Sequence, residues 1–102
     1  MGLNFEDDKE AARWYRRAAE QGLVTAQYNL GVMYYEGTGV LEDSIQAYAW
    51  FNIAAANGYK DANEAKAELN LTQASIEKAQ ARSRKMVEEN PRLLGGSQLI
   101  FP

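Results

Sequence analysis

The chain has 102 residues, of which 46% are hydrophobic, with a net charge of −3 and a pI near 4.9. This length suits one small domain, and the acidic balance argues against a nucleic-acid-binding protein, which usually carries a clustered basic face. Cys and His are both absent, which excludes disulfides, thiolate and imidazole catalysis, and His/Cys metal sites. No apolar run is long enough to span a bilayer, so we expect no membrane partner.

The N-terminal segment has neither the basic residues nor the apolar stretch of a secretory signal peptide. The sequence leaves the compartment open, with the cytoplasm as the default. The chain also begins part-way through the repeated unit described below, as a fragment of a longer protein would.

The first predicted helix covers residues 7–21. Its apolar residues recur at i, i+3, i+4, i+7 and i+8, which marks one face of a helix, and they are Ala11, Trp14, Tyr15, Ala18 and Ala19. Gly22 follows, as a glycine often does at a helix C-terminus. A second helix is predicted over 24–36, and its buried stripe consists of Ala26, Leu30, Met33 and Tyr34.

The segment Gly37-Thr38-Gly39-Val40 predicts a turn with two glycines free to take positive φ. The third helix, over 43–57, begins among Glu42, Asp43 and Ser44, which supply capping oxygens and negative charge. A shorter helix follows over 61–69. Thr72 is the expected N-cap of the last helix, over 73–89, which ends at Asn90-Pro91. The buried stripe of that helix is Ile76, Ala79, Gln80, Ser83, Met86 and Val87.

The first and third predicted helices carry the same residues at an offset of 36. Ala11, Trp14, Ala18, Ala19, Gly22 and Ala26 recur as Ala47, Trp50, Ala54, Ala55, Gly58 and Ala62, Tyr15 recurs as Phe51, and Glu6-Asp7 recurs as Glu42-Asp43. A period in this range indicates stacked supersecondary units. No strand pattern appears, and connections of two to six residues predict antiparallel neighbours in an all-α stack. We expect Trp14 and Trp50 to pack alike between helices, with Tyr15 and Phe51 on buried faces.

These residues resemble the Sel-one-like repeat family, a tetratricopeptide-like α/α repeat. The motifs that carry the resemblance are Ala26-Gln27-Tyr28-Asn29-Leu30-Gly31-Val32-Met33-Tyr34-Tyr35-Glu36-Gly37-Thr38-Gly39-Val40, then Asp43, Ala47, Trp50-Phe51, Ala54-Ala55 and Gly58. The resemblance runs from about Glu6 to Ala62. It implies an α/α solenoid of antiparallel helix pairs, a tetratricopeptide-like superhelix, in which Gly31 permits close helix approach. It also implies a bacterial source and no shared catalytic residues.

The third unit departs from this pattern, because Lys66-Ala67 stands where Leu30-Gly31 stood and Gln73 stands where Gly37 stood. A degenerate last unit usually caps such a stack, so the last helix is interpreted as a C-terminal capping helix. We therefore divide the chain into a repeat domain, 1–91, and an apolar tail, 92–102. Nothing in the tail has helical period.

One face of the second predicted helix carries two tyrosines and a valine that a solvent-exposed face does not need. In tetratricopeptide-like stacks this face lines the groove, and a step of 36 residues leads from it to an acidic face of the fourth helix. The predicted partner-binding groove comprises Thr25, Tyr28, Val32, Tyr35, Glu36, Asp61, Glu64 and Glu68. The alternative is that Tyr28 and Tyr35 pack on a neighbouring unit.

Three other motifs have structural interpretations. The segment Gly37-Thr38-Gly39 lacks the strand before it and the Lys-Ser/Thr after it that a phosphate cradle needs. The pairs Asp7-Asp8 and Glu42-Asp43 sit at helix starts, where the helix dipole explains them without a metal ion. Four basic residues of the last helix alternate with Glu77, Glu88 and Glu89 and are interpreted as a solvated face, with an acidic partner as the alternative; they are Lys78, Arg82, Arg84 and Lys85.

The sequence therefore predicts a non-catalytic adaptor that binds a protein or peptide, with basic residues in the partner, and without cofactor, metal or nucleic acid. The alternative is a self-associating structural module. Its exposed repeat faces and its C-terminal tail would drive homo-oligomerisation, since Leu99-Ile100-Phe101 follows a hinge at Gly95-Gly96 and could dock on an apolar face of the same or a second copy.

Overall fold

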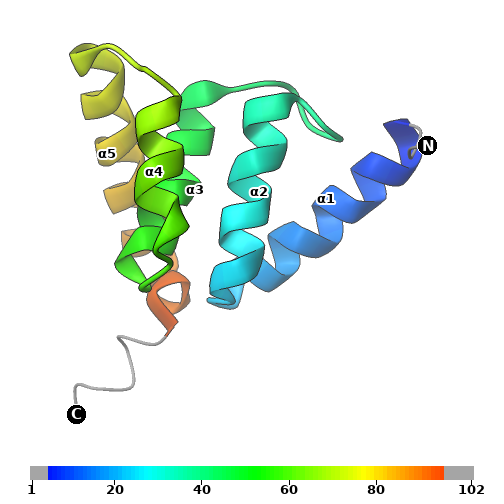
Figure 1. The fold of residues 1–102 in the computed structure, drawn as a ribbon. Helices are drawn as coiled ribbons and strands as arrows, with labels where there is room; N and C mark the ends of the chain where they lie inside the picture. Colours follow the sequence, from blue (N-terminus) through cyan, green and yellow to red (C-terminus); the bar gives the residue numbers. More distant parts are fainter. Residues whose placement is uncertain (1–4, 96–102) are drawn as a thin grey trace.

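The computed structural model describes residues 5–95. Within this range it contains five α-helices, one short 3-10 helix and no strand (Figure 1). The helices are α1 (Phe5–Glu20), α2 (Val24–Glu36), α3 (Ser44–Ala56), α4 (Asp61–Glu68) and α5 (Gln73–Glu89), followed by η1 (Pro91–Leu94). The all-α prediction is confirmed, and each predicted helix boundary lies within two residues of the observed one.

The helices form an α/α solenoid in which α3 is central. It packs against α2, α4 and α5, while α1 packs on α2. Because α2, α3 and α4 alternate in direction, α2 and α4 run the same way with α3 between them (Figure 1). This arrangement places one face of α2 and one face of α4 along the same side of α3.

Local side-chain and backbone signals explain where the helices begin and end. Asp43 accepts a hydrogen bond from the backbone N–H of Gln46 at 3.0 Å and caps α3. Thr72 accepts one from Ser75 N–H at 3.1 Å and caps α5. Gly37 ends α2 in the left-handed conformation, with φ of 72°, which glycine adopts without steric cost. The predicted N-caps Asp43 and Thr72 are thus confirmed.

The core consists of two clusters of small, aliphatic and aromatic side chains. One holds Ala19, Ala26, Leu30, Trp50, Ile53 and Leu93, and the other holds Ala47, Phe51, Ala54 and Ala62. Gly31 lets the Phe51 ring approach α2, because a Cβ at this position would lie 2.6 Å from Phe51 Cε1. The predicted role of Gly31 in close helix approach is confirmed.

The prediction that Trp14 and Trp50 pack alike is wrong. Trp50 is 2% exposed, but Trp14 is 62% exposed, and Tyr15 is also exposed whereas its counterpart Phe51 is buried. The reason lies in what covers each ring. Trp50 shares its cluster with Ala19, Ala26 and Leu30, whereas within residues 5–95 α1 packs mainly on α2. The described chain therefore has no equivalent cover for Trp14.

The C-terminal part of the chain departs from the sequence prediction in two places. On α5, Ala79 and Ser83 are buried as expected, but Gln80 is exposed, so its assignment to the buried stripe is wrong. The unpredicted helix η1 crosses the expected boundary between domain and tail, and its Leu93 is 3% exposed and joins the core. The segment Leu99-Ile100-Phe101, for which we expected docking on an apolar face, lies outside the described residues.

Candidate interaction groove

A cleft of about 180 Å³ lies between α2 and α4, and we call this surface the α2–α4 groove. Side chains from α2 and α4 form its walls, and Phe51 of α3 contributes between them. The lining residues are Tyr28, Val32, Tyr35, Glu36, Phe51, Ala65, Glu68 and Leu69. Five of the eight predicted groove residues are in this set, so residues from two repeat units are brought together around one cleft.

Tyr28 and Tyr35 have different surroundings. The Tyr28 ring is half-buried, with its centroid 5.3 Å from that of Phe51 and 4.6 Å from that of Tyr59. Tyr28 thus packs on the following unit, as in the alternative interpretation, and still lines the cleft. Tyr35 is 47% exposed and lies at the C-terminal end of α2.

The groove is acidic along α4. Burial raises the pKa of the Tyr28 hydroxyl, and so do the nearby Tyr59 and the carboxylates of Asp61, Glu68 and Glu64. The negative charge of these three acids therefore affects the Tyr28 hydroxyl on α2, although their own side chains are exposed. No Lys or Arg occurs in α2. Lys66 of α4 is occupied elsewhere, because its Nζ donates to Asn52 Oδ1 at 3.0 Å and lies over the Tyr48 ring.

The remaining predicted residues lie near the cleft or at its end. Asp61 and Glu64 stand on α4 toward its N-terminus, and Thr25 is exposed in the first turn of α2 without lining the cleft. Sequence reasoning missed Ala65 and Leu69, and it assigned Phe51 to the core only. Leu69 could have been found, because it directly follows α4 and lies four residues after Ala65, which is the helical spacing for one face.

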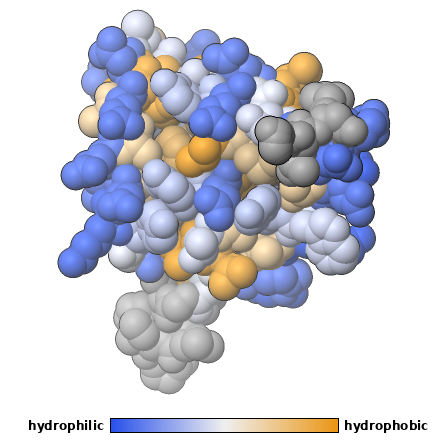
Figure 2. Space-filling model, turned by 45° about the vertical axis from the view of Figure 1, so that its right-hand side comes forward, coloured by the Kyte–Doolittle hydropathy of each residue, from blue (hydrophilic) through white to orange (hydrophobic). Residues whose placement is uncertain are grey.

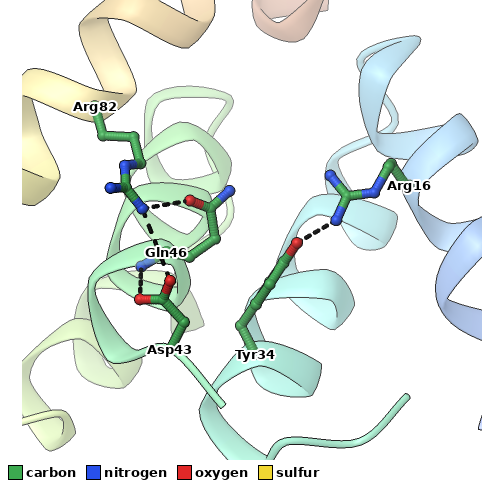
Figure 3. Close-up of polar contacts among 5 residues, drawn as sticks. All are labelled: Arg16, Tyr34, Asp43, Gln46 and Arg82. Atoms are coloured by element: carbon green, nitrogen blue, oxygen red, sulfur yellow. Dashed lines mark hydrogen bonds and ion pairs between the residues drawn. The ribbon is translucent and has the colours of Figure 1, made fainter. Parts of the chain in front are cut away.

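Polar contacts away from the groove join neighbouring helices (Figure 3). Arg16 of α1 donates to the Tyr34 hydroxyl of α2. Arg82 of α5 donates to Gln46 Oε1 at 2.8 Å, and its Nη1 lies 3.8 Å from Asp43 Oδ2 at the start of α3. Such exposed ion pairs contribute little stability. Arg82 nonetheless has partners within the chain, so the basic face of α5 is less available to an acidic partner than its composition indicates.

A buried polar network holds α2 in place, and no sequence pattern predicted it. The Gln27 side chain is fully buried, and its Nε2 donates to the backbone carbonyls of Ala19 at 3.1 Å and Leu93 at 2.9 Å. Asn57 Nδ2 donates to Gln27 Oε1 at 2.8 Å and to the Leu93 carbonyl at 2.8 Å. The network joins the end of α1, α2, the end of α3 and η1, so it fixes the helices behind the groove.

The Sel1 repeat model matches residues 5–23 and 24–59, which together make up more than half of the chain. The chain belongs to the Sel1 repeat family. Leu30, Gly31, Trp50 and Ala54, which carried the resemblance, are all buried. They are structural residues of the repeat, whereas the groove is lined mainly by other residues of α2 and by residues of α4 and its C-terminal end.

Three proteins similar to this Sel1 repeat chain are informative. Chitin synthase regulatory factor 3 of Schizosaccharomyces pombe is 36% identical over 62% of the chain and 7% of its own length. The chitin synthase regulator SKT5 of Saccharomyces cerevisiae is 35% identical over 80% of the chain and 12% of its own length. The crystal structure of a protective antigen of uropathogenic Escherichia coli, described as displaying an SLR fold, matches with a TM-score of 0.77. That match has 35% identity and covers 93% of this chain and 21% of the antigen.

The Sel1 repeat chain therefore spans a small part of each relative. Since the relatives are fungal and the structural neighbour is bacterial, the expectation of a bacterial source stays a prediction. Within residues 5–95, no group of three or more acidic side chains is placed to hold a metal ion, and no helix has both the length and the hydropathy of a membrane span.

Proposed function

We propose that this Sel1 repeat chain is a non-catalytic adaptor module that binds a peptide or a partner surface in the α2–α4 groove. The observation that carries the proposal is the convergence of Tyr28, Tyr35 and Glu68 around one cleft, from two different repeat units. The curated relatives bear the names of regulators of chitin synthase, which fits a role in binding another protein.

The groove has the properties of a preformed interaction site. Its base is rigid, because Gly31 packs against Phe51 and the Gln27 network fixes α2 from behind. A rigid site loses little conformational entropy when a partner binds. Tyr28 and Tyr35 offer large, stiff rings with a polar tip, and such side chains are frequent energetic anchors of interfaces.

Self-association is the second candidate function, and the exposure of Trp14 favours it. Leu23, in the connection between α1 and α2, is also exposed, at 57%. An exposed Trp with a buried counterpart in the same chain is a candidate contact for a second copy. On the face drawn in Figure 2, however, hydrophobic residues form separate patches among hydrophilic ones, whereas stable interfaces usually have a continuous apolar centre.

Site-specific photo-crosslinking in the cells of origin tests the two candidates. A photoreactive phenylalanine analogue replaces Tyr35 in the groove, Trp14 on α1, or Gln80, which is exposed on α5 and serves as the control. The proposal expects a discrete crosslinked protein from the Tyr35 position, absent from Gln80 and lost when Glu64→Lys and Glu68→Lys are added. Equal capture from Tyr35 and Gln80 would contradict it. Crosslinks from Trp14 to another copy of the chain would support self-association instead.

A further inference from the structure

The α2–α4 groove contains one apolar site of defined size. Val32, Phe51, Ala65 and Leu69 supply aliphatic and aromatic carbon around the cleft of about 180 Å³. An apolar cavity of ~150 Å³ accommodates one benzene molecule, and drug-sized ligands need roughly 300 Å³ or more. The cleft therefore has room for one side chain of the size of Leu, Met or Phe, and not for a larger ligand.

Carboxylates surround this apolar site and extend away from it along α4. Glu36 and Glu68 line the cleft itself. Glu64 and Asp61 follow toward the N-terminus of α4, and like Glu68 they raise the pKa of Tyr28. Lys60 carries the opposite charge; it is exposed and directly precedes α4. With four carboxylates and one lysine, the groove is complementary to a positively charged segment.

The spacing between the apolar site and the acidic residues limits the sequence of that segment. Helix α4 rises ~1.5 Å per residue, so the midpoint between Asp61 and Glu64 lies roughly 8–9 Å from the level of Glu68. An extended peptide advances ~3.3 Å per residue, and alternate side chains point to the same side. Side chains two positions apart are therefore ~7 Å apart and both face the groove. The length of a Lys or Arg side chain makes up the difference between this spacing and the distance along α4.

We infer that the α2–α4 groove selects an extended peptide in which an apolar side chain and a Lys or Arg stand two positions apart. This inference rests on the proposed function and specifies the partner. The apolar side chain enters the cleft between Val32 and Leu69, and the basic side chain lies over Tyr28 toward Asp61 and Glu64. Neighbouring positions of the peptide point toward solvent and contribute little selectivity.

Fluorescence anisotropy with labelled peptides on a Gly-Ser background tests this inference on the full chain. The matching peptides contain Leu-Ser-Lys or Lys-Ser-Leu, and the controls contain Leu-Lys-Ser, Ser-Ser-Lys and Leu-Ser-Glu. We expect one or both matching peptides to bind with Kd about tenfold or more below that of Ser-Ser-Lys, the factor expected for burying one Leu side chain. The adjacent-residue and Glu controls should also be weaker. Equal binding of Leu-Ser-Lys, Lys-Ser-Leu and Leu-Lys-Ser, or no binding by either matching peptide up to 1 mM, would overturn the inference.

Paired charge reversals locate the site. Glu64 and Glu77 are both exposed helix residues, on α4 and α5 respectively. Glu77→Lys therefore changes the net charge by the same amount as Glu64→Lys, but at a position away from the groove. Glu64→Lys should weaken the matching peptide by roughly threefold to tenfold at low salt and by less at high salt, because exposed charges are screened. Equal weakening by both variants would overturn the placement. A protein captured at Tyr35 together with failure of the peptides would reject the spacing and leave the proposed function standing.

Discussion

The two tryptophans provide a direct test of the packing described here, because they occupy equivalent positions of the repeat. Trp50→Ala removes a ring that is 2% exposed, and Trp14→Ala removes one that is 62% exposed. Both substitutions lie in the middle of a helix and create the same residue. Any difference in their effect on the free energy of unfolding therefore reflects what surrounds each ring.

The structure sets the expected size of that difference. Truncation of a fully buried Trp to Ala costs ~3–5 kcal/mol, and Trp50 meets this condition. Little more than a third of Trp14 is covered, partly by Arg17 of its own helix, whose guanidinium carbon lies 5.3 Å from the ring centroid. Scaling by the covered fraction gives ~1–2 kcal/mol as an upper limit for Trp14→Ala. The difference of ~2–3 kcal/mol is a large part of a total stability of ~5–15 kcal/mol.

Urea unfolding followed by circular dichroism measures both free energies. Trp50→Ala should also lower the Tm by roughly 12–40 °C, since ~1 kcal/mol corresponds to ~4–8 °C in a domain of this size. The single-tryptophan variants Trp14→Phe and Trp50→Phe supply an independent check, because acrylamide should quench Trp14 strongly and Trp50 weakly. If Trp14→Ala costs as much as Trp50→Ala, then Trp14 is covered in solution and our account of the exposed α1 face is wrong.

Three further predictions concern the core and the groove. Gly31→Leu should destabilise by about 3 kcal/mol or more in thermal melts, because its Cβ alone would lie 2.6 Å from Phe51; wild-type melting would contradict the close approach. Gln27→Leu should cost about 2–4 kcal/mol in urea unfolding, because it removes the buried hydrogen bonds of the Gln27 side chain to the Ala19 and Leu93 carbonyls and to Asn57, and a neutral effect would contradict the network. Because the Tyr28 pKa is raised in the folded state, its contribution is complete below pH ~10 and is lost as pH rises through the folded pKa. Tyr28→Phe should therefore lose less stability than wild type between pH 9 and pH 11.

The sequence predicted the helices well because the signals that define them are local. The i, i+4, i+7 spacing of Ala26, Leu30 and Met33 identifies the buried face of α2 without knowledge of the rest of the fold. The capping side chains of Asp43 and Thr72 likewise accept hydrogen bonds from the backbone N–H of the residue three positions later. These features need only a few consecutive residues, so reading them from sequence is reliable.

The sequence could not predict contacts that depend on a distant partner. The helical pattern around Trp14 matches that around Trp50, but a pattern does not show whether another helix covers the face. Gln27 looks like any polar helix residue, because its acceptor on Leu93 is 66 residues away. In the groove, the sequence placed Tyr28 on the correct face but could not show that Tyr59 stacks on it at 4.6 Å.

The hydrogen bonds of η1 bear on the order in which the protein folds and unfolds. In a repeat array each unit contacts only its neighbours, and terminal units can be lost first. Here Asn90 Nδ2 donates to the Glu20 carbonyl at 3.0 Å, and Gln27 donates to the Leu93 carbonyl. The C-terminal turn is thus bonded to the first two helices, so its detachment leaves polar groups unpaired in the centre of the molecule.

During synthesis, the α2–α3 pair can form while later residues are still missing, because its contacts are close in sequence. The buried amide of Gln27 receives one of its two acceptors only when residue 93 is available. Long-range contacts of this kind form after the local ones, since the chain must first lose loop entropy. The centre of this small solenoid is therefore completed last, by residues from its C-terminal end.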